Sequence, residues 1–159
     1  MSHYRLRTLP IVQNGNVQGQ VSAERIVDLI NKQLSKMKVR VNASNIMTGD
    51  PIVIDSHKTV SAAKSIMKRR RIDHLPVVNN SRLVGIITSS DIMKLMSPSE
   101  RIGKKSIGID DAEDRLSIEV SGVANDDVIT ASVDDTLKNV CDKMINAGSS
   151  YCIINVWDE

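Results

Sequence analysis

Residues 75–96 have the sequence LPVVNNSRLVGIITSSDIMKLM, and a similar stretch lies earlier in the chain. Residues 9–30, LPIVQNGNVQGQVSAERIVDLI, align with it without gaps at an offset of 66 residues, with Leu, Pro and Gly at matching positions. Each copy has two apolar runs separated by a short Asn-containing pair, Asn14–Gly15 or Asn79–Asn80. Because such pairs between apolar runs indicate hairpin turns, each copy predicts two antiparallel strands followed by a helix.

A second internal match supplies the other half of the repeat. Residues 47–67, MTGDPIVIDSHKTVSAAKSIM, align with residues 124–144, ANDDVITASVDDTLKNVCDKM, at an offset of 77 residues. Each copy has a short β-branched run followed by apolar residues at helical spacing. In the later copy these apolar residues are Leu137, Val140, Cys141 and Met144, and Gly148 follows as a helix stop. The two matches together predict a unit of strand, helix, strand, strand and helix.

One complete unit is expected over residues 43–97. Residues 1–34 match its C-terminal half, 98–119 form a polar linker, and 120–159 begin a further unit with its N-terminal half. The two halves could meet in a composite unit, within one chain or by exchange between chains, or the chain could be a truncation of a longer protein. Truncation is favoured, because 1–15 and 144–159 cover overlapping parts of the unit.

The complete unit resembles a CBS domain, the small module named after cystathionine β-synthase. The resemblance rests on the order IMTGDPIVID, a helix from Thr59 to Arg71, HLPVV and LVGIITSSDIM, and it extends more weakly into both flanking halves. It implies an α+β fold of β-α-β-β-α units that pack in pairs, sheet to sheet. It also implies a regulatory protein, not an enzyme, whose clefts bind AMP, ADP, ATP or S-adenosylmethionine, and which is expected to form a homodimer.

The resemblance assigns the ligand's ribose to Thr88 and Asp91. A carboxylate can accept two hydrogen bonds from a ribose diol, and such charge-assisted bonds are strong. The same Thr-x-x-Asp spacing is that of a helix-capping box, so capping alone is the alternative. In the earlier copy Ser22 and Arg25 occupy these positions. Since arginine has only donors, the second cleft is expected not to bind ribose in this way; Arg25 would contact phosphate or stay solvated.

Further ligand contacts follow from the same resemblance, each with an ordinary structural alternative. Ile52 and Val53 would hold adenine or simply form a core strand, and Thr48 would border the cleft or only shape a turn. His74 would contact phosphate or serve a structural role, and Arg70 and Arg71 would contact phosphate or form a solvated helix end with Lys68 and Arg69. The predicted ligand-binding set is Thr48, Ile52, Val53, His74, Pro76, Ile87, Thr88 and Asp91, with Arg70 and Arg71 as candidate phosphate contacts.

Composition narrows the remaining classes of function. Aromatic residues make up 2% of the chain, with no Phe, which argues against modules that stack bases on aromatic platforms. No nucleic-acid partner is expected at a net charge of +2. No apolar run approaches the ~18 residues of a membrane span, no signal peptide opens the chain, and two cysteines and three isolated histidines give no metal-ligand spacing. The sequence therefore predicts a cytoplasmic protein without membrane, metal or cofactor.

Charge is unevenly distributed along the chain. Residues 1–105 contain 18 Lys and Arg against 7 Asp and Glu, whereas residues 106–159 contain 3 against 12. This polarity fits either an anionic partner or packing of one end against the other, in the same chain or a second copy. No P-loop, Rossmann glycine or nucleophile-elbow pattern is present. The leading prediction is a non-enzymatic adenosyl-ligand sensor that signals to a regulated partner; the alternatives are a ligand-free scaffold or dimerisation module, or a regulatory part of a larger multi-CBS protein, enzyme or transporter.

Overall fold

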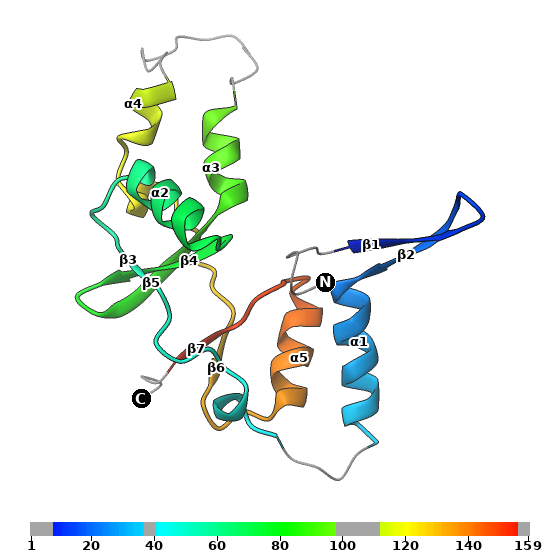
Figure 1. Cartoon of the computed structure of the whole chain (residues 1–159). Coiled ribbons are helices and arrows are strands. Elements are labelled where there is room, and N and C mark those ends of the chain that lie inside the picture. The colour runs from blue at the N-terminus through cyan, green and yellow to red at the C-terminus, as the bar shows by residue number, and fades with distance from the viewer. Residues whose placement is uncertain (1–7, 37–40, 98–111, 156–159) are drawn as a thin grey trace. The chain divides into compact units, whose positions relative to one another are not determined.

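The computed structural model of the chain describes residues 8–36, 41–97 and 112–155. The chain divides into two compact units, whose elements are labelled in Figure 1. Unit 1 combines residues 1–47 with residues 129–159, and unit 2 is formed by residues 48–128. Unit 1 therefore contains segments from both ends of the chain.

Unit 2 has the order of elements that the repeat predicts. It contains strand β3 (Ile54–Asp55), helix α2 (Val60–Arg70), strands β4 (His74–Asn79) and β5 (Arg82–Thr88), and helix α3 (Ser89–Met96). The sheet has the order β3-β4-β5, with β3 parallel and β5 antiparallel to β4. Helix α4 (Ala112–Leu116) and the short 3-10 helix η2 (Val120–Gly122) follow. The predicted α+β class and the order of this repeat are confirmed.

Local sequence signals determine where these elements begin and end. The Thr59 hydroxyl accepts a hydrogen bond from the Ala62 amide and caps the N-terminus of α2. Residues with positive φ form both hairpin turns, Asn14–Gly15 in the earlier copy and Asn80–Ser81 in the later one. The predicted turn Asn79–Asn80 is therefore wrong by one residue, because Asn79 pairs with Arg82 in the ladder.

The core of unit 2 lies between its sheet and its helices. Helices α2 and α3 cover one face of the sheet (Figure 1). Strand residues Leu75, Val77 and Ile87 are fully buried in this core. The remaining buried members of the cluster are Ile54, Val60, Ala63, Met67, Ile92 and Val120.

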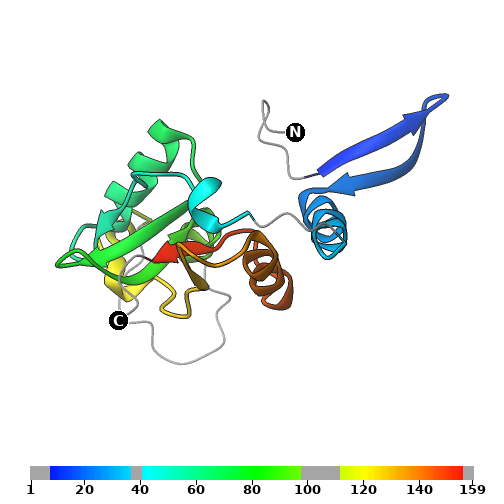
Figure 2. The ribbon, with the colours of Figure 1, turned by 90° about the horizontal axis from the view of Figure 1, so that it is seen from below.

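Unit 1 contains the same kinds of element in a different pairing. Strands β1 (Thr8–Gln13) and β2 (Asn16–Ser22) form an antiparallel hairpin, and helix α1 (Ala23–Leu34) follows it. The other end of the chain supplies strand β6 (Thr130–Ser132), helix α5 (Leu137–Asn146) and strand β7 (Ile153–Asn155), with β7 parallel to β6. Two separate two-stranded sheets result, and Figure 2 shows the hairpin from a second direction. Its buried core comprises only Ala43, Ala131 and Val140 among the described residues.

The segment that precedes each repeat packs in the opposite unit. In unit 2 the Val120 amide donates to the Lys58 carbonyl at 2.8 Å, just before α2. In unit 1 the Ala43 amide, in the 3-10 helix η1 (Ala43–Asn45), donates to the Asp135 carbonyl at 2.8 Å, just before α5. Both members of the second pair precede those of the first by the repeat offset or follow them by it. Part of the stretch expected to be a polar linker therefore forms α4 and leads directly into the core of unit 2.

Candidate functional site

The start of helix α3 combines the two residues predicted to bind ribose. The Thr88 hydroxyl donates to Asp91 Oδ2 at 2.6 Å, and the Thr88 amide donates to the same oxygen at 2.9 Å. In return the Asp91 amide donates to Thr88 Oγ1 at 3.3 Å, which completes a capping box. The Asp91 side chain is 24% exposed, and its second oxygen, Oδ1, lies 3.9 Å from Lys94 Nζ. Capping therefore uses one carboxylate oxygen and leaves the other accessible.

The ladder between β4 and β5 determines what surrounds this corner. His74 and Thr88 are direct partners in the antiparallel ladder, so their side chains lie on the same face of the sheet. His74 is half-buried, whereas Pro76 and Ile87 are buried, Ile87 completely. Among the predicted ligand contacts on the sheet, His74 is therefore close to Thr88, while the side chain of Ile87 belongs to the core and could offer a ligand only its main chain.

The segment that leads into β3 carries the residues predicted to hold adenine. Ile52 and Val53 precede the regular strand and are 37% and 42% exposed. The prediction that both lie within a strand is wrong, because β3 begins at Ile54. Thr48, farther back, is exposed as well. Exposed aliphatic side chains on a non-helical backbone are suited to hold a flat apolar ring, since main-chain groups beside them remain available for hydrogen bonds.

The basic run forms the C-terminal end of α2. Lys68, Arg69 and Arg70 lie in the last turn, where cations interact favourably with the helix dipole. Arg71 ends the helix in the left-handed conformation, with φ 56° and its amide bonded to the Met67 carbonyl. Arg70 and Arg71 are both exposed. Their geometry accounts for a solvated helix end, and a phosphate contact remains a prediction for both.

The corresponding corner of unit 1 differs in chemistry. Ser22 caps helix α1 by accepting from the Arg25 amide at 3.3 Å. The capping role of Ser22 thus matches that of Thr88, while exposed Arg25 stands in place of Asp91. A guanidinium cannot accept hydrogen bonds from a ribose diol.

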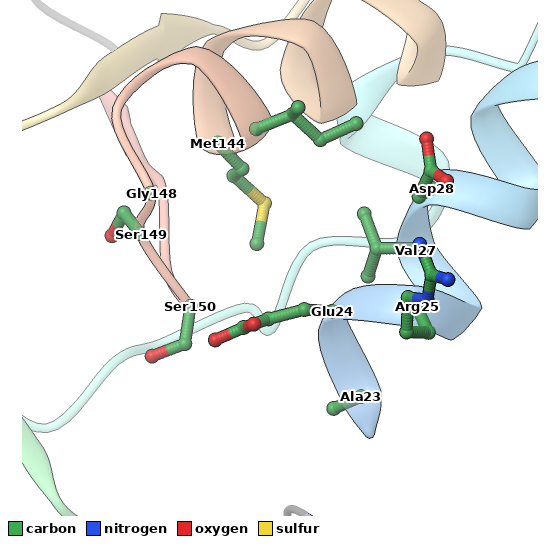
Figure 3. A pocket seen from close by; sticks show the side chains of 10 residues that line it. Ala23, Glu24, Arg25, Val27, Asp28, Met144, Gly148, Ser149 and Ser150 are labelled. Carbon is green, nitrogen blue, oxygen red and sulfur yellow. The ribbon is translucent and has the colours of Figure 1, made fainter. Parts of the chain in front are cut away.

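A pocket that the sequence did not predict opens beside Arg25, between the start of α1 and the end of α5 (Figure 3). Its volume is about 350 Å³. Met144 extends into the space between the two helices, and the side chain of Glu24 extends toward Ser150. The pocket is thus apolar inside and charged at one rim; its lining residues are Ala23, Glu24, Arg25, Val27, Asp28, Met144, Ile145, Gly148, Ser149 and Ser150. No sequence motif marks it, because residues from both ends of the chain form it.

Two further classes of site were checked within the described residues. No group of three or more His, Cys, Asp and Glu side chains in this part of the chain is arranged to hold a metal ion. Cys141 is buried and Cys152 half-buried, both as free thiols, and burial raises the pKa of each thiol. A raised pKa keeps the thiols protonated and unreactive. In the same residues, no helix combines the length and the apolar character needed to cross a membrane.

Comparison with known proteins identifies the fold. Residues 43–98 match the family model of the CBS domain. Protein MJ1225 from Methanocaldococcus jannaschii is 30% identical over 136 residues, which are 86% of this chain and 47% of that protein. Its crystal structure superposes with a TM-score of 0.73, covering 92% of this chain and 51% of the other. The chain therefore spans about half the length of this relative.

Two other similarities complete the comparison. The CBS domain pair of protein MJ0100, solved in complex with 5′-methylthioadenosine and S-adenosyl-L-methionine, is 27% identical with a TM-score of 0.55, covering 70% of this chain and 77% of that one. The A-adding tRNA nucleotidyltransferase of Aquifex aeolicus is 38% identical over 85 residues, or 52% of this chain but only 10% of the enzyme. The similarity to the enzyme thus concerns a small part of it. By the family match and by its fold, this chain belongs to the CBS-domain proteins.

Proposed function

We propose that unit 2 binds an adenosyl ligand at the start of α3, and that the chain is a non-catalytic regulatory module. The observation that carries this proposal is the corner of Thr88 and Asp91, where capping uses Asp91 Oδ2 and leaves Oδ1 accessible. The adenosyl compounds bound to the MJ0100 domain pair, which is 27% identical to this chain, support the ligand class.

Each surrounding residue has a role in this proposal. Asp91 Oδ1 accepts from the ribose hydroxyls, since a carboxylate can bond to both members of a diol. Ile52 and Val53 hold the adenine ring, and Thr48 borders it. His74, the ladder partner of Thr88, faces the phosphate or the substituent at the 5′ position.

Pro76 and Ile87 act indirectly in this arrangement. Their side chains are buried, so they shape the floor of the site and hold the ladder in register beneath the ligand. Arg70 and Arg71 are exposed cations and serve as outer contacts for a phosphorylated ligand. The same site therefore distinguishes nucleotides from uncharged adenosyl compounds by its outer rim.

Calorimetric titration of the full chain tests the proposal. The ligands are 5′-methylthioadenosine, S-adenosylmethionine, AMP and ATP, with GMP as the non-adenine control. We expect saturable binding of at least one adenosyl ligand and a melting temperature that rises with its concentration. Asp91→Asn keeps an acceptor for the cap but removes the charge, and we expect it to weaken binding at least tenfold. Arg25→Gln is the matched control and should leave binding unchanged.

A phosphate contact is tested separately. Arg70→Gln with Arg71→Gln should weaken AMP binding several-fold and leave 5′-methylthioadenosine binding unchanged, because the latter has no phosphate. Equal losses for both ligands would contradict a phosphate role for these two residues.

One observation favours a second function. Arg25 replaces the ribose acceptor in unit 1, which is the pattern expected of a scaffold or dimerisation module that has lost its ligand. If no adenosyl ligand binds a folded chain, the scaffold is the better explanation, and size-exclusion chromatography with light scattering should then show a dimer.

Signalling to a partner completes the leading proposal. A ligand changes the state of a regulated protein only if it binds two conformations of the module unequally. Free thiols at Cys141 and Cys152 agree with a reducing compartment such as the cytoplasm. Comparing amide exchange with and without the ligand that binds would locate the responding surface, and an unchanged exchange pattern outside the site would contradict signalling.

A further inference from the structure

The hairpin of unit 1 has an open edge that its counterpart in unit 2 does not have. Hairpins β1–β2 and β4–β5 share the same pairing, including a register shift at the same repeat position, after Ile11 and after Val77. Strand β4 also pairs with β3, whereas the sheet that contains β1 has only two strands. As a result Val77 is fully buried, while Ile11 is 50% exposed.

The strand that would complete this sheet is β6. At the repeat offset of 77, Ala131 in β6 corresponds to Ile54 in β3. Ile54 pairs with Val77, and Ala131 pairs with Ile154 of β7. Val77 corresponds to Ile154 by one offset and to Ile11 by the other. Strands β1 and β7 are therefore alternative partners for the same edge of β6.

The helices of unit 1 already occupy the positions that a completed unit requires. Helices α1 and α5 correspond to α3 and α2, and they pack against each other as that pair does. Near the C-terminal end of α1, Asn31 Nδ2 donates to Asp142 Oδ1 at 2.7 Å. The 3-10 helix η1 is also in place, since its Ala43 amide bonds to the Asp135 carbonyl. Only the hairpin is not paired as in unit 2.

The pocket marks the space that pairing of the hairpin would close. It opens at the N-terminal end of α1, with Ala23 and Ser150 in its lining (Figure 3). The corresponding residues of unit 2 are in direct contact, where the Ser89 amide donates to the Asp73 carbonyl at 3.0 Å. The two helices of unit 1 are thus joined at one end and separated at the end that adjoins the hairpin.

Gly19 is a second sign of a missing neighbour. Its counterpart, Gly85, is needed because a Cβ there would lie 2.9 Å from the Asn125 carbonyl oxygen and 3.3 Å from Ala124 Cβ. A Cβ on Gly19 would meet nothing within 4 Å, and its φ is not positive. Glycine inside a strand weakens it and often marks close approach of another backbone. Met47, the counterpart of Ala124, lies in unit 1 and would supply that approach.

We propose that β1 and β7 exchange on β6, and that replacement of β7 by β1 closes unit 1 into the three-stranded sheet β6-β1-β2. Closure buries Ile11 and Ile26, whose counterparts Val77 and Ile92 are 0% and 5% exposed. Closure also brings Ala23 toward Ser150, fills the pocket and releases β7. It requires no ligand, so it stands independently of the proposed function.

Disulfide trapping distinguishes the two pairings. Both pairs are made in a Cys141→Ala, Cys152→Ala background, so that no native thiol competes. Ile11→Cys with Ala131→Cys reports the closed pairing, and Ala131→Cys with Ile154→Cys reports the pairing with β7; neighbouring strands bring Cα atoms within the distance that a disulfide spans. We expect both pairs to cross-link within one chain, and Ile154→Pro, which removes a ladder donor from β7, to raise the yield of the closed cross-link several-fold. Gly19→Val should lower it.

The controls keep the test decisive. Asn31→Cys with Asp142→Cys should cross-link in every background, which shows that α1 and α5 remain packed, and circular dichroism checks that each variant is folded. A folded chain that forms only the 131–154 cross-link, with or without Ile154→Pro, would overturn the proposal. Cross-links between residues 11 and 131 found only in dimers would overturn it as well, since the hairpin would then pair with a second copy.

Discussion

Units 1 and 2 contain related sequences but bury them to different extents. Nine residues form the buried core of unit 2, against three among the described residues of unit 1. Matching positions show the contrast, because Ile92 on α3 is 5% exposed and Ile26 on α1 is 38% exposed. Both are apolar, so hydrophobicity alone does not determine which is buried. What differs is the third strand, which in unit 2 joins the hairpin to the layer of helices.

The largest expected difference between the units concerns one leucine of each hairpin. Leu75 is fully buried, and Leu9 at the matching position is only half-buried. Leu75→Ala should lower the free energy of unfolding by about 2–5 kcal/mol, the range for a core leucine. Leu9→Ala should lower it by less than about 1 kcal/mol, as for most partly exposed positions. Urea unfolding followed by circular dichroism measures both, and equal losses would show that unit 1 has a closed core.

The paired glycines provide the next comparison. Gly85→Ala places a Cβ 2.9 Å from a carbonyl oxygen and should cost about 1–3 kcal/mol, as overpacking does. Gly19→Ala meets no atom within 4 Å and should be close to neutral. Thermal unfolding of the two variants tests this difference. A loss for Gly19→Ala as large as that for Gly85→Ala would indicate that the closed pairing dominates in solution.

The two helix caps should differ less. Thr88 takes part in a full capping box with Asp91, whereas Ser22 accepts a single bond from the Arg25 amide. Alanine at an N-cap costs about 0.5–2 kcal/mol, and we expect Thr88→Ala in the upper half of that range and Ser22→Ala in the lower half. Chemical denaturation of both variants measures the order. The reverse order would contradict the capping role assigned to Asp91.

The smallest effect is a pH dependence at the contact between α1 and α5. The pKa of Asp142 is lowered by hydrogen bonds from Lys138 first and Asn31 second. A carboxyl with a lowered pKa in the folded state stabilises it above the unfolded value of about 3.9, and this contribution is lost as the pH falls through the folded pKa. Amide exchange in α1 should therefore become faster on acidification, measured by NMR at neutral pH and near pH 3.

Two variants separate this contact from other titrating groups. Asp142→Asn should remove most of the pH dependence of exchange in α1. Asp135→Asn is the control, because the lowered pKa of Asp135 comes first from Lys143 and then from the Ser132 amide, all within the β6–α5 segment. If Asp135→Asn removed the pH dependence and Asp142→Asn did not, the Asn31–Asp142 bond would not be its source.

The repeat predicted most of unit 2, because its signals are local. The Asn-containing turn, the Thr59 cap and the alternation of apolar residues each act within a few positions. The turn at Asn80–Ser81 was missed by one residue, since Asn79 and Asn80 are chemically alike and only the ladder determines which of them turns.

The pairing in unit 1 was beyond such signals. Whether β6 receives β7 or β1 depends on a competition between segments from opposite ends of the chain, and their apolar patterns are equivalent. The pocket has the same origin, since Ala23 and Ser150 become neighbours only when those ends meet.

The candidate ligand site was predictable to the level of its helix start. The Thr-x-x-Asp spacing at Thr88 and Asp91 implied both a cap and an acceptor, and the structure places both at one corner of the sheet. The sequence did not separate the residues that face outward from those that serve the core. Ile87 is completely buried and Ile52 is 37% exposed, although both are isoleucines in apolar runs; the position of β3 relative to β4 determines this difference.

The reciprocal placement of the lead segments affects how the protein is made. His57 and Glu119, which lie 62 positions apart, are within 3.3 Å of each other in unit 2, and Val120 is part of its core. During synthesis, residues 43–98 leave the ribosome before the segment that completes their core exists. The nascent chain must therefore expose that core until residues near 124 have emerged, and a fragment cut at the boundaries of the family match would lack Val120. The unit that evolution repeats is thus shorter than the unit that folds.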